Sequence, residues 1–186
     1  MELSIQLYLA LLTLVAAGRL IELRHSRHNQ RQLTSAGGQK APEPGYIWMV
    51  ALHAGMLGGC ALEVLLLPRA WLPLLGIPAL AIFLTANAAR WWVIRTLGQR
   101  WNVQVMSPAL GVISTGPYQW VRHPNYTAVF AEMAALPLIH SAWITAALGT
   151  LLHLLVLRNR VTLEESVMQQ DADWQAAFGS RPRFLP

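Results

Sequence analysis

Residues 116–126 read GPYQWVRHPNY, and they bring guanidinium, imidazole, amide and phenol groups together between two apolar stretches. Pro124 suits the first turn of a helix, where its missing N–H is not needed. Arg122 and His123 then lie at the positive N-terminal end of that helix. Free N–H groups, the helix dipole and a guanidinium can together hold a carboxylate there. The run therefore predicts a binding site for a carboxylate ligand at the start of a helix.

The same stretch also suits an interfacial anchor in a membrane. Trp101, Tyr118, Trp120 and Tyr126 would then form an aromatic belt, with Arg122 reaching lipid phosphates. The local chemistry leaves the two interpretations open.

A second group of polar residues occurs in the segment LRNRVTLEESVMQQDADW, at positions 157–174. Arg160 and Glu164 are four residues apart and could pair on a helix surface, which is worth a few tenths of a kcal/mol. Alternatively, one carboxylate faces Arg122 and binds amine or ribose hydroxyl groups of a ligand, while Glu165 points elsewhere. Both interpretations can hold together.

Ionisable groups also occur inside apolar blocks, where their cost predicts pairing or a polar cavity. Glu132 lies about two turns into the helix that starts near Pro124, so it either faces a buried ligand or pairs with Arg90. The histidines show no HxxxH or HxxE spacing, and Cys60 is the only cysteine. No metal site and no internal disulfide are therefore predicted.

Four apolar blocks must position these groups, at residues 3–23, 46–67, 71–94 and 126–157. About 20 apolar residues cross the hydrocarbon core, so each of the first three blocks fits one span. The fourth block is too long for one span and is interrupted by Pro137, His140 and Ser141. We therefore expect a helical hairpin whose first arm, 126–139, rises only about 20 Å and is sheltered by other helices.

The composition agrees with this division of the chain, since 54% of the 186 residues are hydrophobic, 12% are charged and the mean hydropathy is +0.37. We predict one all-α polytopic membrane domain, 1–186, with five membrane segments. Residues 1–95 form three spans, and residues 96–186 form a connector, the hairpin and a C-terminal helix. A basic stripe interleaved with exposed aromatic residues is missing, so nucleic acid is not expected as a partner.

The distribution of Arg and Lys predicts the orientation in the membrane, because short basic loops stay in the cytoplasm. Basic residues follow the first span, the third span and the hairpin, whereas Arg69 is the only charge between the second and third spans. This places the N-terminus outside and the polar motifs on the cytoplasmic side. Gly and Pro residues predict a flexible loop at 35–45, while Gly116 and the prolines predict an ordered connector.

The order of GPY, RHPNY, a two-armed apolar hairpin, an Arg followed by a Glu-Glu pair, and a terminal PRFLP resembles the isoprenylcysteine carboxyl methyltransferase family. The resemblance covers residues 97–186. The family consists of integral membrane enzymes that use S-adenosylmethionine. The resemblance implies a cytoplasmic cofactor site enclosed by the connector, the hairpin and the C-terminal helix. The implied cofactor-binding residues are Gly116, Tyr118, His123, Pro124, Tyr126, Arg160 and Glu164.

The N-terminal segment RLIELRHSRHNQRQL, residues 19–33, is similar to a bacterial subgroup found beside type III polyketide synthases, whose members methylate the ring hydroxyl of alkylpyrones. This resemblance implies a protein of the bacterial inner membrane. No GxGxxG motif follows a predicted strand, so a soluble Rossmann-type methyltransferase is excluded.

The predicted function is S-adenosylmethionine-dependent O-methylation of an acidic oxygen, with S-adenosylhomocysteine as the other product. The acceptor is a membrane-embedded amphipathic molecule, either an isoprenylcysteine-type carboxylate or an alkylpyrone-type enol. Arg122 and Glu164 are the predicted catalytic residues, and the predicted acceptor-binding residues are Arg122, Glu132, Arg181 and Arg183. Two alternatives remain, phospholipid N-methylation and a non-enzymatic lipid-binding protein, and the oligomeric state stays open.

Overall fold

The computed structural model describes residues 2–184, and this range is helical, with no strand and one isolated bridge between Lys40 and Met106. The elements in chain order are α1 (Leu3–Ser35), α2 (Tyr46–Leu66), α3 (Pro73–Leu97), η1 (Gly98–Arg100), η2 (Gly116–Gln119), α4 (Pro124–Leu138), α5 (Trp143–Met168) and α6 (Ala172–Phe178). The predicted all-α class is confirmed.

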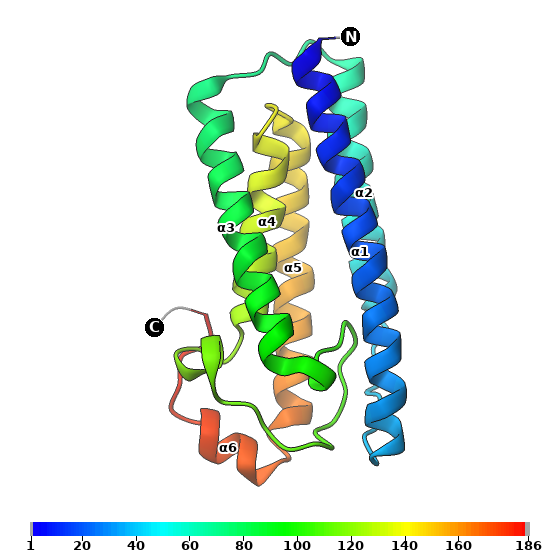
Figure 1. Cartoon of the computed structure of the whole chain (residues 1–186), viewed down its shortest axis with the longest axis vertical. Coiled ribbons are helices and arrows are strands. Elements are labelled where there is room, and N and C mark those ends of the chain that lie inside the picture. The colour runs from blue at the N-terminus through cyan, green and yellow to red at the C-terminus, as the bar shows by residue number, and fades with distance from the viewer. Residues whose placement is uncertain (1, 185–186) are drawn as a thin grey trace.

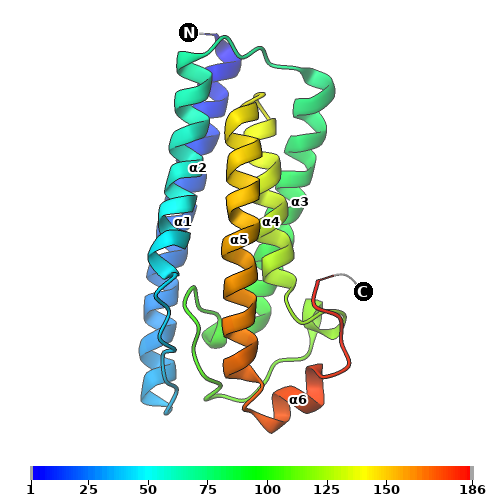
Figure 2. The same cartoon turned by 180° about the vertical axis from the view of Figure 1, so that it is seen from behind.

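The helices form an elongated bundle (Figure 1). α1 and α2 run side by side along one flank, and on the other flank α4 packs against both α3 and α5 (Figures 1 and 2). α2 also packs against α5 and joins the two flanks. α6 and the connector, which is the segment 98–123 between α3 and α4, lie at the end opposite the start of α1. We call this end the site end and the opposite one the closed end.

Four helices in the described range are long and apolar enough to cross a membrane: α1, α2, α5, and α3 extended to Arg100. α4 has 15 residues, so it rises about 22 Å against a hydrocarbon core of about 30 Å. The helix lengths therefore support four spans, whereas the sequence predicts five. α4 lies among longer helices, and the hairpin turn contains Ser141 at φ 56°.

The closed end holds the main apolar core. Its buried members come from α1 to α4 and from the hairpin turn between α4 and α5: Tyr8, Leu12, Cys60, Val64, Ala79, Phe83, Ala135, Leu136, Ile139 and Ala142. The Tyr8 hydroxyl donates to the Leu136 carbonyl oxygen at 3.0 Å, which joins α1 to the end of α4. A Cβ on Gly76 would lie 2.6 Å from the Ile139 carbonyl oxygen, so glycine is needed for α3 to approach the hairpin turn.

Two helices continue well past their apolar blocks toward the site end. α1 has 33 residues and α5 has 26, so polar residues near their C-terminal ends are carried on rigid extensions of the membrane segments. The composition predicts a flexible loop after α1. In the structure, this loop is instead paired with the connector. Ala41 N donates to the Val105 carbonyl at 3.0 Å, and Ser107 N donates to the Gln39 carbonyl at 2.8 Å.

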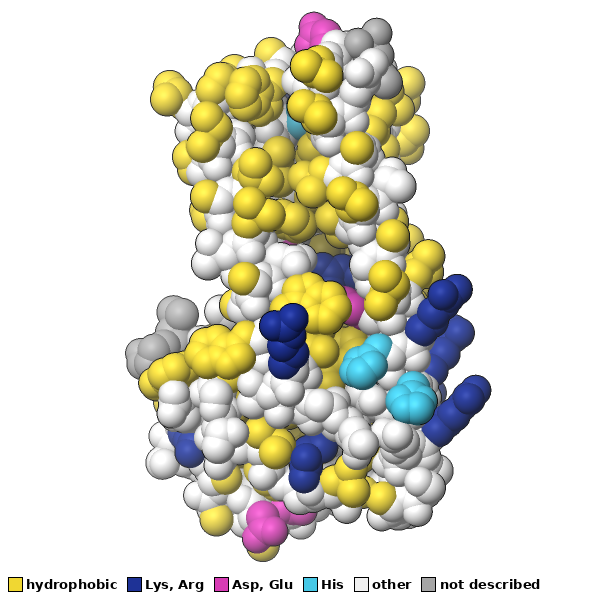
Figure 3. All heavy atoms as spheres, viewed as in Figure 1, with side chains coloured by type: hydrophobic (Ala, Val, Ile, Leu, Met, Phe, Trp, Pro, Cys, Tyr) yellow, Lys and Arg dark blue, Asp and Glu magenta, His cyan; other side chains and the backbone are white. Residues whose placement is uncertain are grey.

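The surface divides along the same axis. Hydrophobic side chains cover most of the closed half, whereas basic and histidine side chains gather on the site half (Figure 3). A hollow at mid-height on this face exposes basic and acidic atoms inside the molecule (Figure 3).

Candidate functional site

A cavity of about 470 Å³ opens between α1, α2 and α5 and is bounded by the connector at the site end. Its size falls within the range of small-molecule binding sites. The part next to the connector is polar and includes Tyr118, His123, Tyr126, Arg160 and Glu164. The part toward the closed end is lined by apolar side chains that include Leu20, Met49, Leu57 and Leu157. We call these two parts the polar lobe and the apolar lobe.

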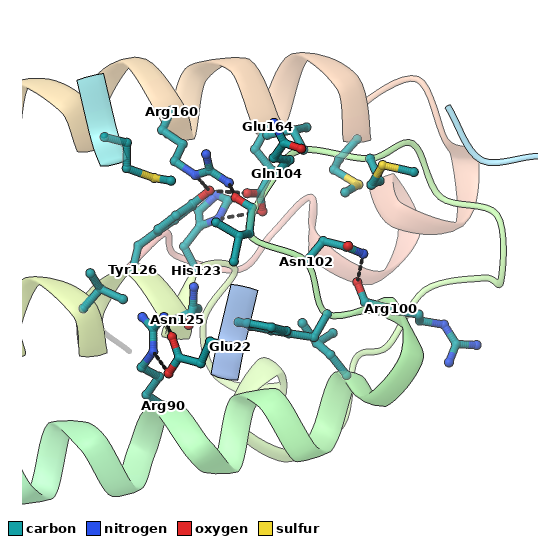
Figure 4. A pocket seen from close by; sticks show the side chains of 18 of the residues that line it. Glu22, Arg90, Arg100, Asn102, Gln104, His123, Asn125, Tyr126, Arg160 and Glu164 are labelled. Atoms are coloured by element: carbon teal, nitrogen blue, oxygen red, sulfur yellow. Dashed lines mark hydrogen bonds and ion pairs between the residues drawn. The ribbon is translucent and has the colours of Figure 1, made fainter. Parts of the chain in front are cut away.

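The start of α4 and the last turns of α5 supply the centre of the polar lobe. The Tyr126 hydroxyl donates to Oε2 of Glu164 and accepts from Nε of Arg160 at 2.9 Å. His123 is the N-cap residue of α4, and Pro124 occupies its first turn as predicted. Figure 4 shows His123, Tyr126, Arg160 and Glu164 gathered at one side of the cavity. The two segments that the sequence singles out therefore meet.

His123 lies between two consecutive carboxylates of α5. Its Nε2 is 3.0 Å from Oε1 of Glu165, and its Nδ1 is 3.6 Å from Oε1 of Glu164. Burial alone would lower the pKa of His123, but the negative charges of Glu164 and Glu165 outweigh it and raise the pKa above its ordinary value. The prediction that Glu165 points elsewhere is wrong, because the imidazole ring is inserted between the two carboxylates.

Arg160 connects three segments of the site. Besides Tyr126, it donates to Oε1 of Glu43 in the loop after α1 and to the Val103 carbonyl in the connector. No direct ion pair with Glu164 forms in the described part of the chain, since the Tyr126 hydroxyl lies between the two side chains. Arg160 therefore positions the walls of the polar lobe rather than forming the predicted surface pair.

The connector is fixed to α1 by polar side chains that the sequence interpretation missed. Asn29 donates to the carbonyls of Trp101 at 2.7 Å and Gly98 at 3.1 Å. Ser26 Oγ accepts from Val103 N at 2.9 Å. Buried positions 22, 26, 29 and 33 follow a helical repeat on α1. A search for a polar face with that repeat would have found them.

Residues 181–184, which we call the C-terminal strap, lie against the start of α4. Arg122 N donates to the Pro182 carbonyl and His123 N to the Arg183 carbonyl, both at 2.9 Å. The Arg183 guanidinium contacts Oε2 of Glu165 at 2.6 Å. Hydrogen bonding to Glu165 raises the pKa of Arg183. The strap thus covers the outer side of the carboxylate that holds His123.

Aromatic side chains of η2 and α6 complete the polar lobe. The rings of Tyr118 and Phe178 are 6.2 Å apart, and those of Phe178 and Trp174 are 5.5 Å apart. All three residues line the cavity. Burial, and then the charge of Glu164, raise the pKa of Tyr118, so its phenol stays protonated at neutral pH.

The structure does not bring every predicted site residue to the cavity. Arg122, Tyr118, His123, Tyr126, Arg160 and Glu164 line it, whereas Gly116, Pro124, Glu132, Arg181 and Arg183 do not. Gly116 adopts φ +58° and packs against Thr96 at the start of η2. Arg181 donates to the Tyr118 carbonyl at 2.6 Å. These residues shape the backbone around the site rather than its inner surface.

Glu132 belongs to a buried ion-pair network instead of the cavity wall. It contacts Arg19 at 2.8 Å and Arg90 at 3.9 Å, and it accepts from Asn87 at 2.9 Å. Arg90 also pairs with Glu22 at 2.6 Å. Glu132 thus lies in an ion-pair network that includes Arg90, the second of the two interpretations of its role, and it does not line the cavity. Within residues 2–184, no group of His, Cys, Asp and Glu could hold a metal ion.

Two bacterial proteins are similar in sequence to this chain. The protein YpbQ of Bacillus subtilis (strain 168), described as uncharacterized, is 28% identical over 164 residues, which are 86% of this chain and 95% of that protein. An uncharacterized protein of Haemophilus influenzae is 35% identical over 91 residues, 48% of this chain and 53% of that protein. No solved structure matches the chain.

One protein family matches the part of the chain that carries the site. Residues 79–170 match the model of the isoprenylcysteine carboxyl methyltransferase (ICMT) family. This range contains the connector, α4 and α5, and hence His123, Tyr126, Arg160 and Glu164. Residues 79–170 therefore belong to the isoprenylcysteine carboxyl methyltransferase family.

Proposed function

We propose that this protein is an S-adenosylmethionine-dependent O-methyltransferase that acts on an acidic oxygen of a membrane-embedded amphipathic acceptor. One observation carries the proposal: a single cavity joins the polar lobe around His123, Tyr126 and Glu164 to an apolar lobe between membrane helices. The polar lobe suits a cofactor with charged and hydroxyl groups, and the apolar lobe suits a hydrocarbon tail. Membership of a methyltransferase family supports methyl transfer as the reaction.

The groups on the wall of the polar lobe fit S-adenosylmethionine. Glu164 offers a carboxylate to an ammonium group or to ribose hydroxyls. Tyr118, Phe178 and Trp174 offer aromatic surfaces to an adenine ring. Trp101 Nε1 is buried and has no hydrogen-bond partner within residues 2–184. Buried polar atoms in native proteins are normally paired, so this N–H suits an acceptor group of a ligand.

The chemistry needs little from the protein beyond alignment. When bound, S-adenosylmethionine supplies a sulfonium methyl group, whose C–S bond breaks, leaving its electron pair on sulfur, as a lone pair of the acceptor oxygen forms the C–O bond. A carboxylate or an acidic enol is already ionised near neutral pH, so no proton moves and no general base is required. Holding the reactants in line and excluding water can each supply several kcal/mol.

The contacts of the polar lobe suit these two tasks. Asn29 and Arg160 hold the connector over the cavity from opposite sides. Glu164 anchors the cofactor, and the raised pKa of His123 favours the positively charged form of the imidazole beside it. Arg122 lines the cavity with 19% of its side chain exposed, which suits steering of an anionic head. Basic residues gather at the site end, so we place the site on the cytoplasmic side of a bacterial inner membrane, with the N-terminus outside.

Transfer of labelled methyl groups tests the proposal directly. Purified protein in detergent is given labelled S-adenosylmethionine and an S-farnesyl-cysteine analogue, a long-chain alkylpyrone or phosphatidylethanolamine. We expect label on one of the two acidic acceptors and measurable S-adenosylhomocysteine binding. Label on phosphatidylethanolamine alone would instead establish N-methylation. Folded protein that binds no S-adenosylhomocysteine would contradict the proposal as a whole.

A pair of variants tests the assigned cofactor site. Glu164→Gln removes a charge from the cavity wall and should weaken S-adenosylhomocysteine binding by about 30-fold, the equivalent of about 2 kcal/mol for a hydrogen bond to a charged group. Asp173→Asn makes the same change at an exposed position of α6 and should leave the affinity unchanged. Equal affinities in the two variants would remove Glu164 from the cofactor site.

A further inference from the structure

Asn125 is a cavity-lining residue for which the fold supplies no partner. Its side chain makes no hydrogen bond within residues 2–184, and its Oδ1 atom is fully buried. A buried amide group left unpaired costs about 1–3 kcal/mol. Oδ1 accepts hydrogen bonds and is closed to solvent, whereas Nδ2 donates, is not among the buried atoms and makes no hydrogen bond within residues 2–184, so Nδ2 is the atom that is open to an acceptor group of a ligand.

The position of Asn125 separates two groups of side chains. It is the second residue of α4, directly after Pro124, so the backbone from which it projects is fixed. Figure 4 shows Asn125 between the cluster of His123 and Tyr126 on one side and the ion pair of Glu22 and Arg90 on the other. Asn125 therefore lies where the polar lobe, which suits the cofactor, meets the rest of the cavity.

The other polar groups at this level are already engaged. Arg90 donates from Nε and Nη2 to Glu22, and Arg19 donates to Glu22 and Glu132. Two arginines thus face two carboxylates, which leaves no surplus charge for an anion. The side-chain amide of Asn125 is an uncommitted hydrogen-bonding group of the cavity wall, and the start of α4 adds a favourable potential for negative charge.

We propose that Asn125 binds the acid head of the methyl acceptor, a site that rests on the proposed methyltransferase function. Its amide N–H donates to one oxygen of a pair that shares a negative charge, as in a carboxylate or an enolate conjugated with a carbonyl. The second oxygen keeps its lone pair for the methyl group. The hydrocarbon tail then extends into the apolar lobe beside Leu20 and Leu57.

Replacing Asn125 by Asp gives the sharpest test, because the side chain keeps its shape and exchanges the donor for a negative oxygen. Binding to the complex of the protein with S-adenosylhomocysteine is measured for an S-farnesyl-cysteine analogue, a long-chain alkylpyrone, and an amine that carries the same farnesyl tail. We expect Asn125→Asp to weaken binding of the acidic probe that the wild type prefers by at least about tenfold. Binding of the amine should not weaken.

A matched control and a second variant keep the test decisive. Asn159→Asp makes the same change at an exposed position of α5 and should leave all affinities unchanged. Asn125→Leu preserves the side-chain size without charge, and it should also weaken the acidic probe, by about tenfold. Its measurement replaces that of Asn125→Asp if the latter does not fold. S-adenosylhomocysteine affinity should stay within about threefold of wild type in both variants.

The possible results separate this proposal from the proposed function. Unchanged binding of the acidic probe, a wild type that prefers the amine, or an equal loss of S-adenosylhomocysteine binding would each overturn the role of Asn125. The last result would assign Asn125 to the cofactor instead. A wild-type protein that binds no S-adenosylhomocysteine would overturn the methyltransferase function itself.

Discussion

The two ends of the bundle are held together by different forces. The closed end is packed with apolar side chains around Phe83 and Leu136, and few polar groups take part. At the site end the same helices enclose a cavity, and the contacts are hydrogen bonds and ion pairs between distant segments. Regions with few buried apolar contacts open at lower free-energy cost. The difference indicates that stability comes mainly from one end and ligand binding from the other.

One buried polar side chain at the closed end, Glu63, also stabilises the fold. α5 begins after Ala142, which has no side chain that can cap a helix. Glu63 of α2 takes this role, since it accepts from the backbone N of Ile144 at 3.0 Å and of Thr145 at 2.8 Å, and pairs with Arg69 at 2.7 Å. Glu63 is therefore a helix cap supplied by a neighbouring helix.

Removal of this cap should have the largest effect on stability. Glu63→Ala leaves two backbone N–H groups and Arg69 without their acceptor, which should cost about 3 kcal/mol of unfolding free energy. Thermal unfolding in detergent measures the loss, and Glu63→Gln should cost less because an acceptor oxygen remains. S-adenosylhomocysteine affinity, measured below the unfolding transition, should not change. A parallel fall in that affinity would contradict the division between the two ends.

At the site end, Glu165→Ala should affect ligand affinity, which Glu63→Ala leaves unchanged. Glu165 is 3% exposed and does not line the cavity, so it acts through His123. Its loss should weaken S-adenosylhomocysteine binding by about 20-fold, roughly 2 kcal/mol, because His123 is no longer held from outside. A variant with wild-type affinity would show that Glu164 positions His123 alone.

The pH dependence of binding tests the same contact. The pKa of His123 is raised, so its charged pairing with Glu164 and Glu165 is fully present below the ordinary pKa and is lost as the pH rises through the raised one. S-adenosylhomocysteine affinity should therefore fall as the pH rises through the raised pKa of His123. Glu165→Gln removes one negative charge, so this fall in affinity should occur at lower pH. A fall at the same pH as in the wild type would assign the titration to another group.

The sequence predicts the closed end better than the site end. The apolar blocks give α1, α2 and α3, and the interruption at Pro137 to Ser141 gives the turn of the hairpin. Apolar periodicity and length are sufficient there, because burial in a membrane depends on local composition. Length also limits the prediction, since α4 is too short to count as the fifth span.

The site end depends on contacts that local patterns do not encode. One of the two interpretations of the Glu-Glu pair, supported by the family resemblance, brings a carboxylate of α5 to the Arg122 and His123 end of α4, and in the structure His123 contacts both carboxylates. The contact of Arg160 with Glu43, which are 117 residues apart, has no such signal. The direction of Glu165 was mispredicted for the same reason, as it depends on where a separate helix places an imidazole ring.

The connector offers a smaller and more selective perturbation. Asn29→Ala removes two hydrogen bonds to the connector and should cost about 1 kcal/mol. We expect S-adenosylhomocysteine affinity to fall about fivefold, because the connector covers the polar lobe. His28→Ala, at the neighbouring exposed position, should change neither quantity. If Asn29→Ala lowered only the unfolding temperature, the connector would be part of the scaffold rather than of the site.

The strap should contribute least, because the side chain of Arg183 is 56% exposed and water screens its charge. Arg183→Gln leaves Glu165 on His123, and Arg122 remains 3.5 Å from Glu165. The backbone contacts of the strap also persist, so we expect at most about a threefold loss of S-adenosylhomocysteine affinity, smaller still in high salt. A loss as large as that of Glu165→Ala would mean that the strap itself holds His123. Glu165 would then act only by binding Arg183, and the site end would depend on a single exposed ion pair.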